Sequence, residues 1–279
     1  MSTPTHFQPG VHPSAVVDPD AVIHPSATIG PYAVVGPRVV VGPRSVLHNH
    51  ACLIGPTTLG EDNVVYPFAV VGAEPQDLKY HGETTELIIG DRNRIREHVT
   101  IHRGTEIGGG TTVIGSDCLV MVGAHIAHDC VIEDQAVIAN SVMLGGHCLI
   151  EFGATIAGGA GLHHFTTVGQ FAFVGGLARI TKDVPPFLVV EGSPAEPRKV
   201  NTTALLRRGW SDDEVDALRA AYKALFRGDD PMAYTLERLR AEPCASAAVT
   251  RLCDFLERMA LGVHGRYRES FRSAAAPRR

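Results

Sequence analysis

The sequence predicts a mainly β fold, a parallel β-helix of hexapeptide repeats, followed by a small C-terminal α-helical domain. Three observations support this prediction. Aliphatic residues recur at every sixth position, glycine often follows them, and the pattern changes to helical spacing after Pro185-Pro186. A strict period of six with a following glycine is typical of a parallel β-helix, whereas helices show a period of 3.6 and ordinary strands a period of two.

The aliphatic positions, which we call rungs, form two in-phase series. The first is Val11, Val17, Ile23, Ile29, Val35, Val41, Leu47, Leu53, Leu59, Val65 and Val71, and the second is Ile114, Val120, Ile126, Ile132, Ile138, Leu144, Ile150, Ile156, Leu162, Val168, Val174 and Ile180. Each six-residue unit should form a short strand and a turn, with the rung inside and a small residue at a tight corner. Stacked coils then bury an aliphatic core and satisfy the backbone of their neighbours. A β-sandwich does not generate such a long in-phase series.

Two interruptions of the period predict loops that leave the β-helix. The first lies near residues 73–87, where polar residues replace the rungs, and the second lies near residues 103–113, through Gly108-Gly109-Gly110. Excursions on a repeat scaffold usually bind ligands, because the core does not need them. We therefore assign residues 1–186 to the β-helix and expect both loops to contribute to a site.

The remainder of the chain predicts helices. Ser211 and Glu214 have capping-box spacing, and apolar residues follow them at helical intervals. The predicted units are a bridge over residues 187–201, a helical domain over residues 202–270 with later helices at Met232–Arg240 and Val249–Leu261, and a disordered tail over residues 271–279.

Composition argues against several classes of protein. A net charge of -5 and a pI near 6.3 give no reason to expect nucleic-acid binding. No apolar run is long enough to predict integral membrane association, and Met1–Gly10 lacks the features of a secretory signal. The six cysteines form no CxxC pair, so buried, reduced thiols in a cytoplasmic protein are expected rather than disulfides or zinc ligands.

Histidines between the rungs indicate where chemistry takes place. In a coil of three units, residues eighteen positions apart stack at the strand spacing of about 4.8 Å. This spacing places His128, Gly146 and His164 in one column and Asp129 and His147 in the next. Histidine exchanges protons near neutral pH, and a neighbouring aspartate fixes its tautomer. The cluster predicts proton-transfer chemistry. The alternatives are a polar face without catalytic function and a zinc site.

Several segments together resemble the UDP-N-acetylglucosamine O-acyltransferases of lipid A biosynthesis. These segments are Gln76–Tyr80, Gly90–Glu97, Thr100–Thr105 and Ala124–Cys130, with further matches at Asn201, Arg207–Gly209 and Ala221–Lys223. The resemblance implies a left-handed parallel β-helix and a homotrimer. It also implies transfer of an (R)-3-hydroxyacyl group from acyl carrier protein to the 3-hydroxyl of a UDP-sugar, UDP-N-acetylglucosamine, without a metal or redox cofactor.

The resemblance also implies roles for individual residues. His128 matches the general base and Asp129 its orienting partner, while Gly176 matches the position that limits acyl-chain length. Substrate contacts are implied for the histidines His102, His125, His147 and His163, for the loop residues Gln76, Asp77 and Lys79 across a subunit boundary, and for Arg207 and Arg208 of the helical domain. The stacking of Gly146 on His128 makes its N–H the candidate donor to an oxyanion. His164 departs from the family's usual glutamine and is expected to affect the sugar-nucleotide contact.

Three other functions are alternatives to this one. A γ-type carbonic anhydrase uses the same β-helix with a zinc ion held by three histidines between subunits. A related N-acyltransferase of the same pathway carries an additional N-terminal domain, whereas the rungs here begin at Val11. A non-catalytic β-helix would retain its function when His128 is replaced.

Overall fold

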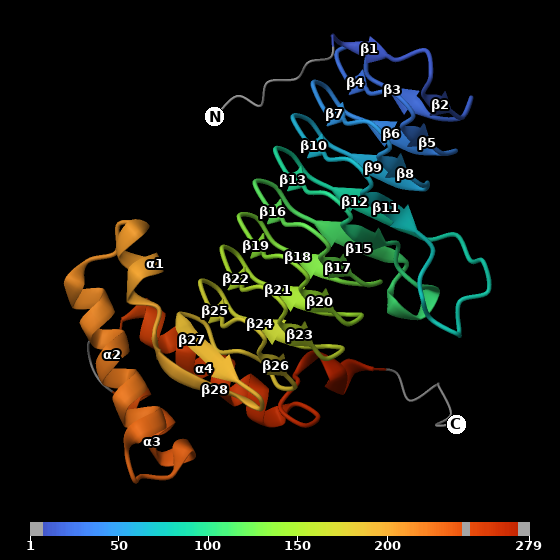
Figure 1. The fold of residues 1–279 in the computed structure, drawn as a ribbon. Coiled ribbons are helices and arrows are strands. Elements are labelled where there is room, and N and C mark those ends of the chain that lie inside the picture. The colour runs from blue at the N-terminus through green and yellow to red at the C-terminus, as the bar shows by residue number, and fades with distance from the viewer. Residues whose placement is uncertain (1–7, 242–245, 273–279) are drawn as a thin grey trace.

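A left-handed parallel β-helix forms the elongated body of the molecule, and helices lie beside one of its ends (Figure 1). The computed structural model describes residues 8–241 and 246–272. The predicted fold class is therefore confirmed. None of the helices in these ranges is long and apolar enough to cross a membrane.

Three sheets form the sides of the β-helix, and the chain visits them in turn. Over the described residues, the first sheet has eleven strands, the second nine and the third eight. The first contains β1 (Gly10–Val11), β4 (Thr28–Ile29), β7 (Val46–Leu47), β10 (Val64–Val65), β13 (Arg94–Ile95), β16 (Leu119–Val120), β19 (Val137–Ile138), β22 (Thr155–Ile156), β25 (Phe173–Val174), β27 (Leu188–Gly192) and β28 (Ala195–Val200). The second contains β2 (Val16–Val17), β5 (Val34–Val35), β8 (Cys52–Leu53), β11 (Val70–Ala73), β14 (Thr100–His102), β17 (His125–Ile126), β20 (Met143–Leu144), β23 (Gly161–Leu162) and β26 (Arg179–Ile180). The third contains β3 (Val22–Ile23), β6 (Val39–Val41), β9 (Thr57–Leu59), β12 (Glu86–Ile89), β15 (Thr111–Ile114), β18 (Val131–Ile132), β21 (Leu149–Ile150) and β24 (Thr167–Val168).

The rungs form the core because each lies directly above the rung of the preceding coil. Ile132 of β18 pairs with Ile150 of β21, and both side chains are fully buried. The small residues Ala124 and Cys130 occupy buried corners between strands. The rungs of the first coil are the exceptions: 49% of the surface of Val11 is exposed, and Val17 and Ile23 are only partly buried, because a neighbouring coil covers them on one side only.

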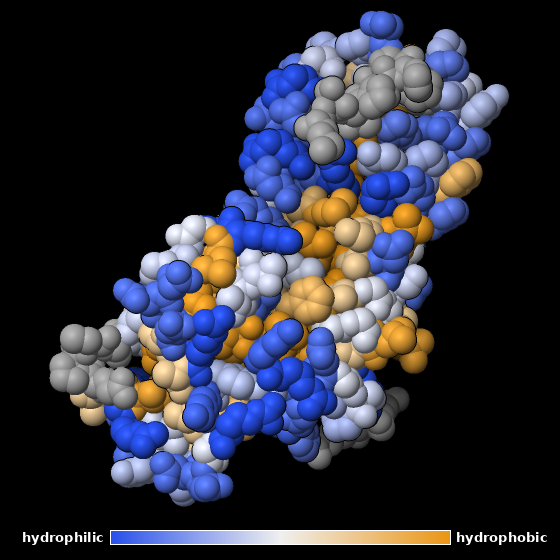
Figure 2. Space-filling model, turned by 60° about the vertical axis from the view of Figure 1, so that its left-hand side comes forward, coloured by the Kyte–Doolittle hydropathy of each residue, from blue (hydrophilic) through white to orange (hydrophobic). Residues whose placement is uncertain are grey.

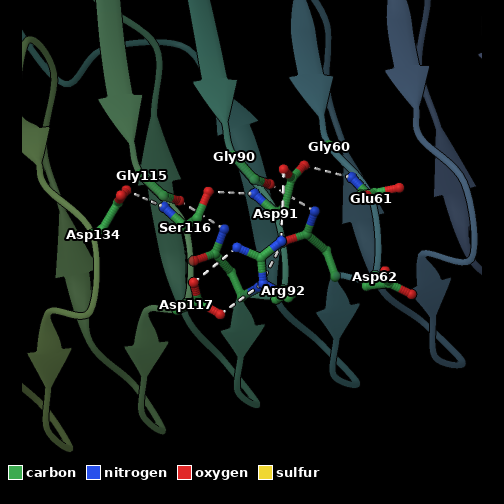
Figure 3. A network of polar contacts seen from close by, with 12 residues as sticks. Gly60, Glu61, Asp62, Gly90, Asp91, Arg92, Gly115, Ser116, Asp117 and Asp134 are labelled. Atoms are coloured by element: carbon green, nitrogen blue, oxygen red, sulfur yellow. Dashed lines mark hydrogen bonds and ion pairs between the residues drawn. The ribbon is translucent and has the colours of Figure 1, made fainter.

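Side chains also satisfy backbone groups at the corners between coils. The N–H of Ser116 donates to the carboxylate of Asp134 at 2.7 Å, and the N–H of Asp91 donates to Ser116 Oγ at 3.0 Å (Figure 3). The guanidinium of Arg92 forms an ion pair with Asp117 of the next coil. These contacts fix the stacking at this edge of the β-helix. The same kind of contact, from a side chain to the N–H of the neighbouring coil, recurs in the candidate site.

Two loops leave the second sheet where the sequence predicts excursions (Figure 1). The longer covers residues 74–85 between β11 and β12, and the shorter covers residues 103–110 and contains the 3₁₀ helix η1 (Glu106–Gly108). Buried Arg103 connects them, because its Nη1 donates to the carbonyl of Gly72 at 2.7 Å and its Nη2 to the hydroxyl of Tyr80 at 3.2 Å. The long loop is thus held at its base and in its middle.

The predicted bridge is a β-hairpin. β27 continues the first sheet in parallel with β25, and β28 pairs with β27 in the antiparallel direction. The helices that follow are α1 (Thr202–Arg207), α2 (Asp212–Arg227), α3 (Met232–Ala241), α4 (Ala247–Leu261) and the 3₁₀ helix η2 (Arg268–Phe271). Ser211 and Glu214 form the predicted capping box at the start of α2. The helices and the hairpin share a second apolar core, to which the helices contribute Leu205 and Leu218.

Figure 2 shows hydrophobic surface along the middle of one face of the molecule, between more hydrophilic surfaces at its two ends. The free thiols among the described residues are Cys52, Cys118, Cys130, Cys148 and Cys253. Cys244 lies outside the described residues, as does the part of the predicted disordered tail that follows Arg272.

Candidate active site

His128 and Asp129 form a buried hydrogen-bonded pair at the corner after β17. His128 Nδ1 donates to Asp129 Oδ2 at 2.7 Å. The same carboxylate accepts the backbone N–H of Thr105 at 2.8 Å and its hydroxyl at 2.6 Å. Burial alone would raise the pKa of Asp129, but the hydrogen bonds from His128 and Thr105 outweigh burial and hold the pKa below its ordinary value. The ionised carboxylate keeps the proton of His128 on Nδ1, so Nε2 is free to accept a proton.

His147 stacks on this pair from the next coil. Its Nδ1 lies 3.6 Å from Asp129 Oδ2, and its ring meets that of His128 edge-on, with the ring centres 5.1 Å apart. On the other side it lies flat against Phe165, with the centres 4.3 Å apart. Burial lowers the pKa of His147 to about 4, so its ring is neutral near pH 7. A neutral imidazole beside His128 leaves Asp129 available to stabilise a charge on His128.

Gly146 lies between His128 and His164, as the eighteen-residue spacing predicts. A Cβ atom at position 146 would come within 2.5 Å of Cε1 of the His128 ring, so the His128 ring fits only over a glycine. The Gly146 N–H donates to Nδ1 of His164 at 2.9 Å. Burial lowers the pKa of His164, so its ring is neutral and carries its proton on Nε2. The Gly146 N–H, which the sequence predicts to be an oxyanion donor, therefore already donates to another acceptor in this structure.

The cluster lines a cavity of about 890 Å³. Its walls include seven of the fourteen predicted site residues, namely Gln76, Asp77, Lys79, His128, His147, His163 and His164. A second cavity, of about 480 Å³, is lined by Gln76, His125, His128, His163 and His164. The two cavities adjoin because they share four of these residues. The loop residues Gln76, Asp77 and Lys79 line the cavity of their own chain. Their contact with substrate across a subunit boundary stays a prediction.

Six predicted residues line neither cavity. Asp129 and Gly146 lie directly against His128, and the other four lie further from it. His102 is buried behind His125, with the ring centres 5.0 Å apart, and burial lowers the pKa of His102 to about 4. Arg207 ends α1, and Arg208 follows it, donating to Gln135 at 2.8 Å with its guanidinium 4.5 Å from the centre of the Phe171 ring. Gly176 lies on an exposed turn after β25, where an added Cβ would meet only the carbonyl of Gly158, at 3.4 Å.

Several residues at the site were not assigned a role from the sequence. Thr105 lies within a segment that carries the family resemblance, but only the structure shows its two hydrogen bonds to Asp129. Tyr267, Arg268 and Arg272 line the larger cavity from the C-terminal segment, part of which the sequence predicts to be disordered. No repeat, motif or spacing in the sequence connects this segment to the histidines.

One group among the described residues offers three metal ligands close together. The ligand atoms of His128, Asp129 and His147 all lie within 4.8 Å of one another. The Asp129 carboxylate already accepts hydrogen bonds from Thr105 and His128, so a metal ion would have to replace some of these donors. The three side chains are therefore arranged as a His128–Asp129 hydrogen-bonded pair with the imidazole of His147 beside it.

Comparisons with known proteins connect this site to an acyltransferase family. Residues 183–264 match the family model described as UDP N-acetylglucosamine O-acyltransferase, domain 2, and residues 20–55 and 111–146 match bacterial transferase hexapeptide repeats. The acyl-[acyl-carrier-protein]--UDP-N-acetylglucosamine O-acyltransferase of Anaeromyxobacter sp. is 49% identical over 211 residues, which are 76% of this chain and 82% of that protein.

Solved structures agree with the sequence comparison. The UDP-N-acetylglucosamine O-acyltransferase of Moraxella catarrhalis superposes with a TM-score of 0.84 and 42% identity over 88% of this chain and 95% of that one. The UDP-N-acetylglucosamine acyltransferase of Francisella novicida gives a TM-score of 0.85 and 34% identity over 89% and 91% of the two chains. The chain therefore belongs to the acyl-[acyl-carrier-protein]--UDP-N-acetylglucosamine O-acyltransferase family.

Proposed function

We infer that this chain catalyses the first step of lipid A biosynthesis. It transfers an (R)-3-hydroxyacyl chain from acyl carrier protein to the 3-hydroxyl of UDP-N-acetylglucosamine, the donor and acceptor named for its relative in Anaeromyxobacter. The observation that carries this inference beyond family membership is the buried His128–Asp129 pair in the wall of the cavity. Such a pair provides the base that acyl transfer to an alcohol needs.

The proposed reaction begins at Nε2 of His128. A sugar hydroxyl is a poor nucleophile until its proton is removed, so His128 accepts this proton as the oxygen attacks the thioester carbonyl. The carbonyl carbon gains a bond to the sugar oxygen and then loses its bond to sulfur. The thiol of the carrier leaves with the proton that His128 returns. Asp129 stabilises the imidazolium that forms between these two steps.

Negative charge develops on the carbonyl oxygen during the attack. We assign its stabilisation to the N–H of Gly146, which must exchange His164 Nδ1 for the oxyanion. A backbone donor in such a position is typically worth about 100- to 1,000-fold in kcat. In the ground state, the Gly146 N–H donates to His164. As the oxyanion forms, it is a stronger acceptor than His164, and the N–H donates to it instead.

The remaining predicted residues contact the substrates in this proposal. His147, His163 and the loop residues Gln76, Asp77 and Lys79 line the larger cavity, which accommodates the sugar nucleotide. The smaller cavity includes Met143, Leu144 and Leu162 beside His125 and offers an apolar path for the acyl chain. Its far end is assigned to Gly176, where the absence of a side chain leaves room for a longer chain.

A homotrimer and a cytoplasmic location are part of the same proposal. Arg207 and Arg208 lie away from the cavity of their own chain, so contact with substrate requires a neighbouring subunit. The apolar surface in Figure 2 offers an area for subunit contact. A monomer in sedimentation equilibrium would contradict the trimer. Recovery of the native protein with membranes or outside the cytoplasm would contradict the location.

The proposed function is tested by an acyl-transfer assay. UDP-N-acetylglucosamine is paired with acyl carrier proteins that bear 3-hydroxyacyl chains of different lengths, and product formation is followed by mass spectrometry. His128→Gln is expected to fold normally and to lose several orders of magnitude in turnover. A purified chain that transfers no acyl group, or one that needs stoichiometric zinc for its activity, would refute the assignment.

A further inference from the structure

The segment after α4, residues 262–272, returns to the last coils of the β-helix, and we call it the C-terminal strap (Figure 1). Asp183 holds it at two points: its N–H donates to the carbonyl of Gly265, and its carboxylate accepts the N–H of Tyr267, both at 2.8 Å. Arg266 is buried and donates to the carbonyl of Thr181 at 2.6 Å. The strap is therefore fixed to the β-helix by backbone groups and by the side chains of Asp183 and Arg266. Most of it lies beyond residue 264, where the match to the family model ends.

The strap reaches the catalytic cluster directly. Nε of Arg268 donates to the carbonyl of His147 at 3.1 Å. The guanidinium of Arg272 lies 5.9 Å from the centre of the Phe165 ring, and Phe165 is the ring on which His147 stacks. Both arginines line the cavity that contains His128. Because Arg268 uses Nε for His147, its two Nη groups remain available to a ligand.

The cavity wall beside the strap carries cations that no carboxylate neutralises. Among the described residues, no ion pair is formed by Lys79, Arg258, Arg268 or Arg272, all of which line the cavity. The four acids in the same wall have other partners. Glu151 pairs with Arg251 at 2.9 Å and Glu269 with Arg266 at 2.7 Å, whereas Asp183 accepts backbone N–H groups and Asp77 accepts the backbone N–H of Lys79 at 3.0 Å. Unpaired guanidinium groups beside a large cavity favour a phosphate ligand, which planar forks bind through paired hydrogen bonds.

We propose that Arg268 and Arg272 of the C-terminal strap bind a phosphate group of a substrate at the wall of the cavity that contains His128. This assignment rests on the proposed function, in which both substrates carry phosphate. One source is the diphosphate of the sugar nucleotide. The other is the phosphate of the phosphopantetheine arm of acyl carrier protein. The strap is then a positioning element that holds one reactant near Nε2 of His128.

The test is a titration of UDP, and separately of free phosphopantetheine, into the full chain and its variants. The double variant Arg268→Gln/Arg272→Gln removes two charges, while the side-chain amide introduced by Arg268→Gln keeps a donor for the carbonyl of His147. Its Kd for one ligand is expected to rise about 10- to 100-fold, as the loss of charge-assisted hydrogen bonds predicts. The matched control is Arg38→Gln, an exposed arginine on the early coils. Raised salt should weaken binding to the wild type more than to the double variant.

The outcomes separate the possibilities. Weaker binding of UDP alone identifies the nucleotide diphosphate, and weaker binding of phosphopantetheine alone identifies the donor arm. The double lysine variant at the same positions keeps the charge and is expected to retain most of the affinity. Unchanged affinity for both ligands in a folded, active double glutamine variant would overturn the proposal but leave the proposed function intact. A wild-type chain that binds neither ligand and transfers no acyl group would overturn both.

Discussion

The N–H of Gly146 donates to Nδ1 of His164 at 2.9 Å, so the residue that departs from the family's usual glutamine contacts the candidate oxyanion donor directly. The same geometry occurs at Ser116, whose N–H donates to Asp134 of the next coil at 2.7 Å. A side chain that caps a corner N–H is therefore a general feature of this β-helix. At Gly146 the cap competes with the oxyanion for one donor.

Replacement of His164 by alanine tests this competition. The variant frees the Gly146 N–H and removes a wall of the cavity, so we expect KM for the sugar nucleotide to rise while kcat is unchanged or increases. Steady-state kinetics with both substrates varied separate the two effects. His164→Gln is the control, because its amide oxygen still accepts the N–H. A fall in kcat of about 100-fold or more for the alanine variant would instead make His164 itself the oxyanion donor.

Substitution of Gly146 by alanine tests the packing of the base. The added methyl group would lie 2.5 Å from Cε1 and 2.8 Å from Nε2 of His128, so the imidazole must move. Since an error of about 1 Å in position costs on the order of 100-fold, we expect at least that loss in kcat. Gly36→Ala serves as the control, because its methyl group meets backbone atoms only at 3.4 Å or more. Wild-type turnover in Gly146→Ala would show that the ring has another productive position.

The columns of the site could be predicted from the sequence because the β-helix has a fixed period. Once residues eighteen apart stack, the position of His147 relative to Asp129 follows from their numbers. In the structure, Nδ1 of His147 lies 3.6 Å from Oδ2 of Asp129. Both loops were also predicted, since the rungs stop at them. The period carries no information about conformation outside the coils. The hydrogen bonds from Thr105 to Asp129 and from Arg268 to His147 therefore had no signal in the sequence.

The hydrogen-bond partners at the site could not be predicted from the eighteen-residue spacing either. The spacing indicates that Gly146 and His164 are neighbours, but not that the N–H of one donates to the ring of the other. That contact depends on the rotamer of His164 and on its protonation state, and burial decides the latter. Arg208 is a second example, because its contact with Phe171 depends on where the hairpin directs α1.

Arg103 is expected to control the loop that carries Gln76, Asp77 and Lys79. In Arg103→Met the carbonyls of Gly55 and Gly72 lose their donor, which should cost about 2–3 kcal/mol of unfolding free energy and loosen the loop. The expected kinetic result is a raised KM with a smaller change in kcat. Faster tryptic cleavage at Lys79 in the native protein would report the loosening. Tyr80→Phe removes only one contact of Arg103 and should have a weaker effect. Unchanged proteolysis and KM in Arg103→Met would contradict this role.

The stability of the protein is expected to fall between pH 6.5 and pH 4, in part because of His102. Burial lowers the pKa of His102 from 6.5 to about 4 in the folded chain. Between these values the unfolded chain binds a proton that the folded chain does not, so acid favours unfolding, and the stability is lost as the pH falls. The full shift corresponds to at most about 3 kcal/mol. His147, whose pKa is also lowered to about 4, acts in the same direction.

His102→Phe tests this assignment, because a ring of similar shape that cannot be protonated should make the stability less dependent on pH. At pH 7.5 the variant should be at least as stable as the wild type, because it removes a buried Nδ1 that has no hydrogen-bond partner among the described residues. Denaturant unfolding from pH 4.5 to 7.5, at one protein concentration, measures both effects. His24→Phe, at an exposed position far from the site, controls for the loss of an imidazole. If His102→Phe lost stability with acid as steeply as the wild type, the acid sensitivity would have to come from other groups.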